Sequence, residues 1–216
     1  MTIHLLIGNK NHSSWSLRAW LALTEAGIPF EETVVELYVD GSKEKLLAFS
    51  PAGKVPAIRD GDITVWESLS ILEYLAETFP EKHLLPSDKA ARAHCRSISN
   101  EMHGGFLGLR REMPMDIRAM RENLPLSDEA LEATARIDAI WTDCLARYGG
   151  PFLFGHFTMA DAMYAPVIYR FRTYGYAPGA PSAAYMEFMR ARPSLKAWET
   201  AALAEPWHNE RLERRA

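Results

Sequence analysis

Apolar and polar positions change their spacing once along this chain. Short apolar runs in the first part predict buried strands, and they lie at 3–8, 33–37, 54–59 and 63–66. Asp60 and Gly61 separate the last two runs, and an Asp-Gly pair between strands is typical of a hairpin turn. Apolar residues at helical spacing predict helices between and after the strands, at 13–27, 44–49 and 68–79. This part of the chain is therefore expected to form a mixed sheet with helices.

The second part of the chain has helical spacing almost throughout, beginning near residue 86. We expect five helices here, the first two capped by Ser-Asp pairs, at 88–112, 127–148, 158–174, 182–191 and 194–204. The change of pattern predicts a boundary near 84–88. We therefore predict an α/β domain at 1–83 and an all-helical domain at 88–216.

Composition and charge narrow the class of protein. Of the 216 residues, 48% are hydrophobic and 24% charged, which is typical of a globular chain and excludes disorder and fibrous repeats. The 24 basic and 28 acidic residues are mixed along the sequence, so we expect no nucleic-acid partner. The apolar run at 3–7 follows no basic segment and is too short for a signal peptide or a membrane span. We therefore expect a cytoplasmic protein with no membrane partner.

The cysteines and histidines give no sign of a metal site or a disulfide framework. Cys95 and Cys144 are too far apart for a CxxC motif, and both lie in apolar helical stretches where we expect them to pack in the core. The seven histidines show no HExxH spacing. The sequence therefore predicts no bound metal and fits a reducing compartment.

Four short motifs carry the candidate chemistry, and each begins or adjoins a predicted element. They are SSWSLR at 13–18, GKVP at 53–56, ESLSI at 67–71 and FTMAD at 157–161. The unpaired N–H groups and positive dipole end of a helix N-terminus favour an anionic ligand at 13–14 and at 67–68. Each motif alone also has an ordinary structural interpretation. The serines and the S/T-x-x-acid pair Thr158 and Asp161 can cap helices, and Pro56 can start an edge strand.

In this order and spacing, the motifs resemble those of the cytosolic glutathione S-transferases over essentially the whole chain. The resemblance is closest to the zeta and theta-like classes, which use a serine, although Trp15 stands where the zeta class usually has a cysteine. It implies a thioredoxin-like N-terminal domain with a four-stranded mixed sheet, followed by a C-terminal helical bundle. It also implies a homodimer that uses glutathione as co-substrate and needs no metal.

The same resemblance implies which residues act on glutathione. A serine hydroxyl at the first helix would stabilise the thiolate; counting back from Gly27 favours Ser13, and matching through Arg18 favours Ser14. A cis peptide bond between Val55 and Pro56 would let the Val55 backbone pair with the cysteinyl segment of glutathione. The other implied contacts are Ser68 to the γ-glutamyl carboxylate, Glu67 to the ammonium group, and Lys43 or Lys54 to the glycyl carboxylate.

The acceptor substrate is expected between the two domains. The residues implied there come from the helix around 103–111 and the helix around 164–172, and they are His103, Phe106, Leu107, Arg110 and Arg172. The two arginines are candidates to hold an anionic substrate. Apolar residues at helical spacing are also typical of a core, and exposed arginines are often merely solvated.

The function that the resemblance implies is transfer of the glutathione thiolate to an electrophilic small molecule. One alternative is a glutathione-dependent cis–trans isomerase of maleyl-type acids. Another is a non-catalytic binding protein that shares the fold. A glutathione-dependent reductase is disfavoured because no cysteine lies at the start of the first helix.

Overall fold

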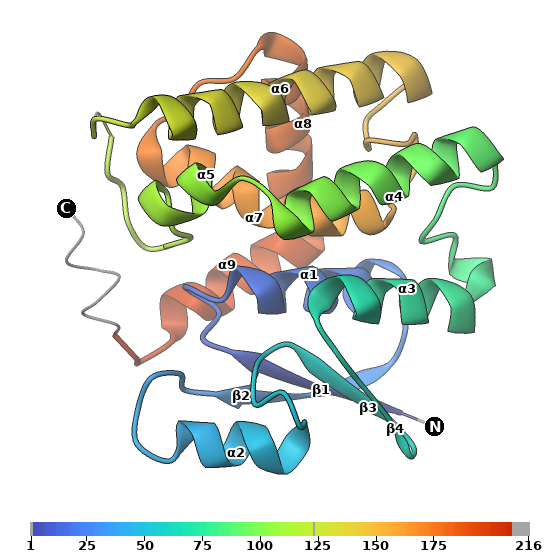
Figure 1. The fold of residues 1–216 in the computed structure, drawn as a ribbon, viewed down its shortest axis with the longest axis vertical. Helices are drawn as coiled ribbons and strands as arrows, with labels where there is room; N and C mark the ends of the chain where they lie inside the picture. Colours follow the sequence, from blue (N-terminus) through green and yellow to red (C-terminus); the bar gives the residue numbers. More distant parts are fainter. Residues whose placement is uncertain (1, 123, 209–216) are drawn as a thin grey trace.

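The computed structural model describes residues 2–122 and 124–208 (Figure 1). Its sheet has four strands in the order β2-β1-β3-β4, formed by β1 (Ile3–Gly8), β2 (Phe30–Val35), β3 (Ala57–Asp60) and β4 (Ile63–Trp66). β1 pairs in parallel with β2, whereas the β1–β3 and β3–β4 pairs are antiparallel. The mixed four-stranded sheet is therefore confirmed. β2 begins at Phe30, earlier than the expected residue 33.

Both faces of the sheet are covered by helices. Figure 1 shows α1 (Ser14–Glu25) and α3 (Ser68–Thr78) between the sheet and the helical region, with α2 (Ser42–Phe49) on the opposite side. Successive side chains of a strand point to opposite faces. In β1, Leu5 and Ile7 accordingly join the large core with α1 and α3, while Leu6 packs with α2 in a small separate cluster.

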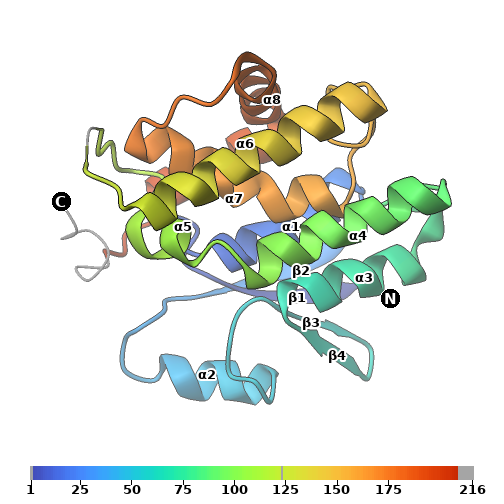
Figure 2. The same cartoon turned by 45° about the horizontal axis from the view of Figure 1, so that its top comes forward.

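The helical region is built around α7. Its described helices are α4 (Lys89–Gly104), α5 (Leu107–Glu112), α6 (Asp128–Tyr148), α7 (Met159–Tyr174), α8 (Ala180–Ala191) and α9 (Pro193–Ala204), with a short 3₁₀ turn (Pro80–Lys82) before them. Nearly every residue of α7 is buried, and the helix lies between α6 and α1 in both views (Figure 2). A helix that is buried on all sides belongs to an interior. One hydrophobic core therefore runs from the sheet into the helical region, and the predicted fold class is confirmed.

One predicted helix is wrong: the single helix expected at 88–112 is two helices. α4 ends at Gly104, Phe106 takes a left-handed backbone conformation with φ of 60°, and α5 starts at Leu107. The two consecutive glycines are poor helix formers. A Cβ on Gly105 would also lie 2.7 Å from the Glu101 carbonyl oxygen, so the chain can turn tightly there only with glycine. This break changes which side chains of α5 face the interior.

Two smaller predictions for the helical region are confirmed. Thr158 and Asp161 form a capping box at the start of α7. Cys95 and Cys144 are free, buried thiols, and burial raises the pKa of each to about 12.

None of the helices in the described ranges is long and apolar enough to cross a membrane.

Candidate active site

A cavity of about 760 Å³ lies where the start of α1 meets the sheet, α2, the start of α3 and the helical region. Its walls come from both parts of the chain. The lining residues from the first part are Asn9, His12, Ser13, Ser14, Trp15, Leu37, Tyr38, Ser42, Lys43, Leu46, Gly53, Lys54, Val55, Pro56, Glu67 and Ser68. Those from the helical region are Arg110, Pro114, Met115 and Arg170. Every residue expected to bind glutathione therefore lines this cavity.

Both serines of the first motif stand at the start of α1, in different environments. Ser13 is the N-cap, where its Oγ accepts a hydrogen bond from the Ser16 N–H at 3.4 Å and donates to Ser16 Oγ at 2.7 Å. Ser14 is the first helical residue, and its Oγ accepts a hydrogen bond from Arg170 Nη2 at 3.1 Å. The cavity therefore adjoins a helix N-terminus that carries two hydroxyl groups, as an anionic ligand requires.

The GKVP segment forms the wall beside α2. The Val55–Pro56 peptide bond is cis, which confirms the prediction from the sequence. Lys43 donates a hydrogen bond from Nζ to the Gly53 carbonyl at 3.1 Å, so its ammonium group is held at this wall. A Cβ on Gly53 would lie 2.7 Å from that Nζ, and the glycine also has a positive φ of 54°. Gly53 thus leaves room for the lysine at the edge of the cavity.

The start of α3 supplies a second helix N-terminus to the cavity. Ser68 is fully buried, and its Oγ has no hydrogen-bond partner within the described residues. Glu67 precedes it with a positive φ of 67° and a side chain that is 47% exposed. A buried hydroxyl without a partner is costly, so such a group at a cavity wall is a candidate for ligand binding.

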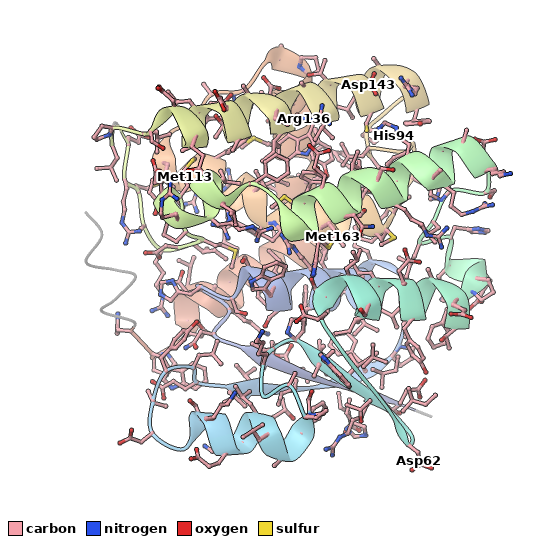
Figure 3. All side chains as sticks on the ribbon, viewed as in Figure 1. Asp62, His94, Met113, Arg136, Asp143 and Met163 are labelled. Atoms are coloured by element: carbon pink, nitrogen blue, oxygen red, sulfur yellow. The ribbon has the colours of Figure 1, made fainter. Side chains whose placement is uncertain are left out.

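Three arginines, Arg18, Arg110 and Arg170, interact through their charges beside the cavity, and the first two pack against Trp15. The guanidinium carbons of Arg18 and Arg110 lie 4.3 and 4.6 Å from the centre of the indole ring. Arg18 donates from Nε to the Met163 carbonyl, and Arg170 donates from Nη1 to the Met113 carbonyl; Figure 3 labels both methionines. Burial lowers the pKa of Arg18 and of Arg170, to about 9 for Arg170, and the charge of Arg110 lowers both further. This side of the cavity is consequently positive.

Of the residues expected to hold the acceptor substrate, one lines the cavity and another lies beside it. Arg110 lines the cavity and donates from Nε to the Gly105 carbonyl at 2.9 Å. His103 lies beside the cavity, with its ring against Trp15 and its Nε2 3.9 Å from Glu67 Oε2. Burial, and then the charge of Arg18, lowers the pKa of His103 and so disfavours its protonated form.

Phe106, Leu107 and Arg172, like His103, do not line the cavity. Leu107 is 64% exposed and Phe106 packs against the core, because the break at Gly105 changes the direction in which these side chains point. Arg172 donates to the Ile117 carbonyl and lies 3.4 Å from Glu199. Positions two apart on a helix face nearly opposite sides, so the arginine of α7 that reaches the cavity is Arg170.

Two features of this site are not predicted from the sequence: the position of Arg170 at the cavity and the packing of two arginines against Trp15. A signal for Arg170 is present in the sequence, since it interrupts an otherwise apolar stretch of the predicted helix at 162–171. A charge within such a stretch either forms a buried pair or serves a site. Periodicity alone could not distinguish Arg170 from Arg172.

One group of side chains away from the cavity has the residue types of a metal site. His94, Asp143 and Cys144 place one ligand atom each within 4.8 Å of one another, and Figure 3 labels the first two. His94 shares a hydrogen bond of 3.0 Å with the Tyr148 hydroxyl, and Asp143 pairs with Arg147. Two of the three candidate ligands therefore already have protein partners, and we assign no ion to this group.

Two family models and several curated proteins are similar to this chain in sequence. Residues 12–78 match the family model of the glutathione S-transferase N-terminal domain, and residues 125–201 match that of the C-terminal domain. The chain is 32% identical over 163 residues to the maleylacetoacetate isomerase of Rattus norvegicus, covering 74% of this chain and 73% of that protein. It is 43% identical over 91 residues to a probable maleylacetoacetate isomerase of Caenorhabditis elegans, a match that spans 41% of that protein.

The similarity extends to solved structures. A glutathione transferase homologue from Burkholderia gl BGR1, with bound glutathione, superposes with a TM-score of 0.71 at 26% identity, covering 95% of this chain and 100% of that one. A glutathione transferase Omega 3C from Trametes versicolor, at 23% identity, shares the fold with a TM-score of 0.72 over 100% of this chain and 90% of that one. The family models, the rat relative and these folds agree, and the chain belongs to the glutathione S-transferase family.

Proposed function

We propose that the protein is a glutathione transferase that binds glutathione in the cavity and directs its thiolate to an electrophilic small molecule. The observation that carries the proposal is the convergence of three features on one cavity: the start of α1 with Ser13 and Ser14, the Val55 segment, and the start of α3 with Ser68. The similar structure from Burkholderia gl BGR1, which holds glutathione, supports the same ligand here.

The three features match the three parts of glutathione. The γ-glutamyl carboxylate suits the free N–H groups and the unpartnered Ser68 hydroxyl at the start of α3, and Glu67 is suited to the adjacent ammonium group. The backbone of Val55 is suited to pair with the extended cysteinyl segment. Lys43 and Lys54 are the cations for the glycyl carboxylate. Bound in this way, glutathione would present its sulfur to the start of α1.

Ionisation of the thiol is the chemistry that this site must supply. A free thiol has a pKa of roughly 8.5, so only a small fraction is thiolate at neutral pH. The positive end of α1, a serine hydroxyl and the nearby arginines all favour the anion. The thiol proton leaves to solvent, and the thiolate attacks the electrophile held on the side of Arg110 and Met115.

A second candidate function is glutathione-dependent cis–trans isomerisation of a maleyl-type acid. The similarity to the maleylacetoacetate isomerase of Rattus norvegicus favours it. In this reaction the thiolate would add to the alkene, the resulting single bond would rotate, and expulsion of the thiolate would restore the double bond. The same thiolate therefore serves both functions, and the acceptor distinguishes them.

We also propose the assembly and setting that such an enzyme would have. The N-terminal domain at 1–83 of one subunit would pack against the helical domain at 88–216 of the other in a two-fold homodimer. The two free cysteines are consistent with a reducing, cytoplasmic setting. Light scattering at micromolar concentration is expected to give twice the mass of the chain, whereas a monomer with full activity would contradict the dimer.

The test of the proposed function is a comparison of acceptors with the purified full chain. Glutathione-dependent conversion of an aryl halide, an epoxide or a hydroperoxide would support the transferase, and isomerisation of maleylacetoacetate would support the second candidate. Calorimetry on the same sample measures glutathione binding separately. Binding without any conversion would support a non-catalytic binding protein, and no binding would refute the assignment of the cavity.

A further inference from the structure

The two serine hydroxyls at the start of α1 differ in whether their protons are already donated to a protein acceptor. Ser13 donates its proton to Ser16 Oγ, and that oxygen also accepts a hydrogen bond from the Gly8 N–H at 3.0 Å. Ser13 Oγ in turn accepts from the Ser16 N–H. The Ser13 hydroxyl thus both donates and accepts a hydrogen bond, and through Ser16 it connects the end of β1 to the first turn of α1.

Ser14 has the opposite arrangement. Its Oγ accepts from Arg170 Nη2 at 3.1 Å, and an arginine has donors but no acceptor. The proton of the Ser14 hydroxyl therefore cannot be used in this contact. It has no other side-chain or backbone acceptor within the described ranges, and Ser14 lines the cavity. The hydroxyl is left with its proton available to an acceptor in the cavity.

Arg170 is firmly held where it makes this contact. It is 4% exposed, it donates from Nη1 to the Met113 carbonyl at 2.6 Å, and its Nε has no partner within the described residues. Burying an arginine without a carboxylate partner is expensive for folding. A pKa of about 9, lowered by burial and by Arg110, still leaves it charged at neutral pH. Such a cost at a cavity wall indicates a functional role.

The charged and titratable groups around this contact are mostly cationic. Arg18 on α1 and Arg110 on α5 act on Arg170 through their charges, and Tyr174 acts from α7 itself. The remaining titratable groups that line the cavity are His12, Tyr38, Lys43, Lys54 and Glu67. Glu67 is the one carboxylate among these lining residues, and it belongs to the start of α3. The acceptor that Ser14 lacks is therefore expected to come from an anionic ligand.

We propose that Arg170 is a positioning residue that orients the Ser14 hydroxyl toward the sulfur of bound glutathione, so that Ser14 rather than Ser13 donates to the thiolate. The inference rests on the proposed function. No proton is transferred from Ser14: the thiol proton leaves to solvent, and the Ser14 O–H donates a hydrogen bond to the sulfur anion. Ser13 keeps the helix start in place.

The test measures thiolate ultraviolet absorbance against pH for glutathione bound to the full chain. A hydrogen bond to a charged group is worth roughly 1.5–3 kcal/mol, so Ser14→Ala should reduce the thiolate fraction about tenfold or more at a pH below the thiol pKa. Arg170→Met should reduce it similarly, Arg170→Lys should restore part of it, and Ser13→Ala should reduce it less than Ser14→Ala does. Arg172→Met is the matched control on α7, since Arg172 contacts Ile117 and Glu199 instead.

The double variant Ser14→Ala/Arg170→Met distinguishes a positioning effect of Arg170 on Ser14 from a direct effect of the Arg170 charge on the thiolate. If Arg170 acts through Ser14, the double variant should lose little more thiolate than Ser14→Ala alone. If the two residues act independently, the free-energy effects of the two single changes should add. Additive effects, or a larger loss in Ser13→Ala than in Ser14→Ala, would overturn the inference while leaving the proposed function intact. A wild-type bound thiol as weakly acidic as free glutathione would overturn both. Should Arg170→Met fail to fold, the Arg170→Lys and serine variants still decide between the two serines.

Discussion

Replacement of Ser68 by alanine should weaken glutathione binding without lowering the stability of the ligand-free protein. Ser68 Oγ is buried at the start of α3 and has no partner within the described residues, and the residue makes no capping hydrogen bond. An unpartnered buried hydroxyl costs about 1–3 kcal/mol, so its removal should leave the free protein equally or more stable. The proposed hydrogen bond to the γ-glutamyl carboxylate is worth roughly 1.5–3 kcal/mol, so the Kd of glutathione should rise roughly tenfold to a hundredfold.

The assay pairs calorimetric titration of glutathione with thermal unfolding of the ligand-free chain. Ser70→Ala is the matched control, because Ser70 is an exposed serine on the same helix. Glu67→Gln should also weaken binding by removing the partner of the ammonium group, while Glu73→Gln on the same helix alters only a surface pair with Arg96. A Ser68→Ala variant that binds like wild type, or that unfolds at a clearly lower temperature, would refute the reasoning about this hydroxyl.

Three further predictions concern the helical region. Asp161 accepts hydrogen bonds from Leu153, Thr158 and Tyr185, so Asp161→Asn should lower the free energy of unfolding by about 2–4 kcal/mol. Burial raises the pKa of Asp161 to about 6, so its contribution to stability should be greatest near pH 4 and fall as pH rises through 6, as wild-type and Asp161→Asn denaturation curves would reveal. Gly108→Ala should cost about 1–3 kcal/mol in denaturant unfolding, because the new Cβ would lie 2.8 Å from a backbone nitrogen of α6. The buried thiols should react with a thiol reagent only after unfolding, and fast reaction of the native chain would contradict their placement in the core.

Much of the fold could be predicted because local rules and the tertiary structure agree. Every residue of the strand at Ile3–Gly8 except His4 is buried because both faces of the sheet are covered, and the Asp60-Gly61 pair marks the hairpin that β3 and β4 form. The capping box at Thr158 likewise needs only residues that are close in sequence. The residues expected to bind glutathione lie in one cavity because their motifs begin or adjoin elements of one sheet.

The acceptor side could not be predicted in the same way, because it depends on how elements distant in sequence meet. The break at Gly105 changes the phase of α5, so Leu107 points to solvent while Arg110 reaches the cavity. Which arginine of α7 faces Ser14 depends on the rotation of that helix against α1, and helical spacing does not fix this rotation. Contacts between elements therefore decide the site where sequence spacing leaves alternatives open.

A crystal structure of the full chain with glutathione bound would show directly where the ligand lies. We expect the sulfur within hydrogen-bond distance of Ser14 Oγ, the cysteinyl backbone beside Val55, and the γ-glutamyl carboxylate at the Ser68 hydroxyl. Glutathione bound outside this cavity, or bound within it with its sulfur away from the start of α1, would refute this placement.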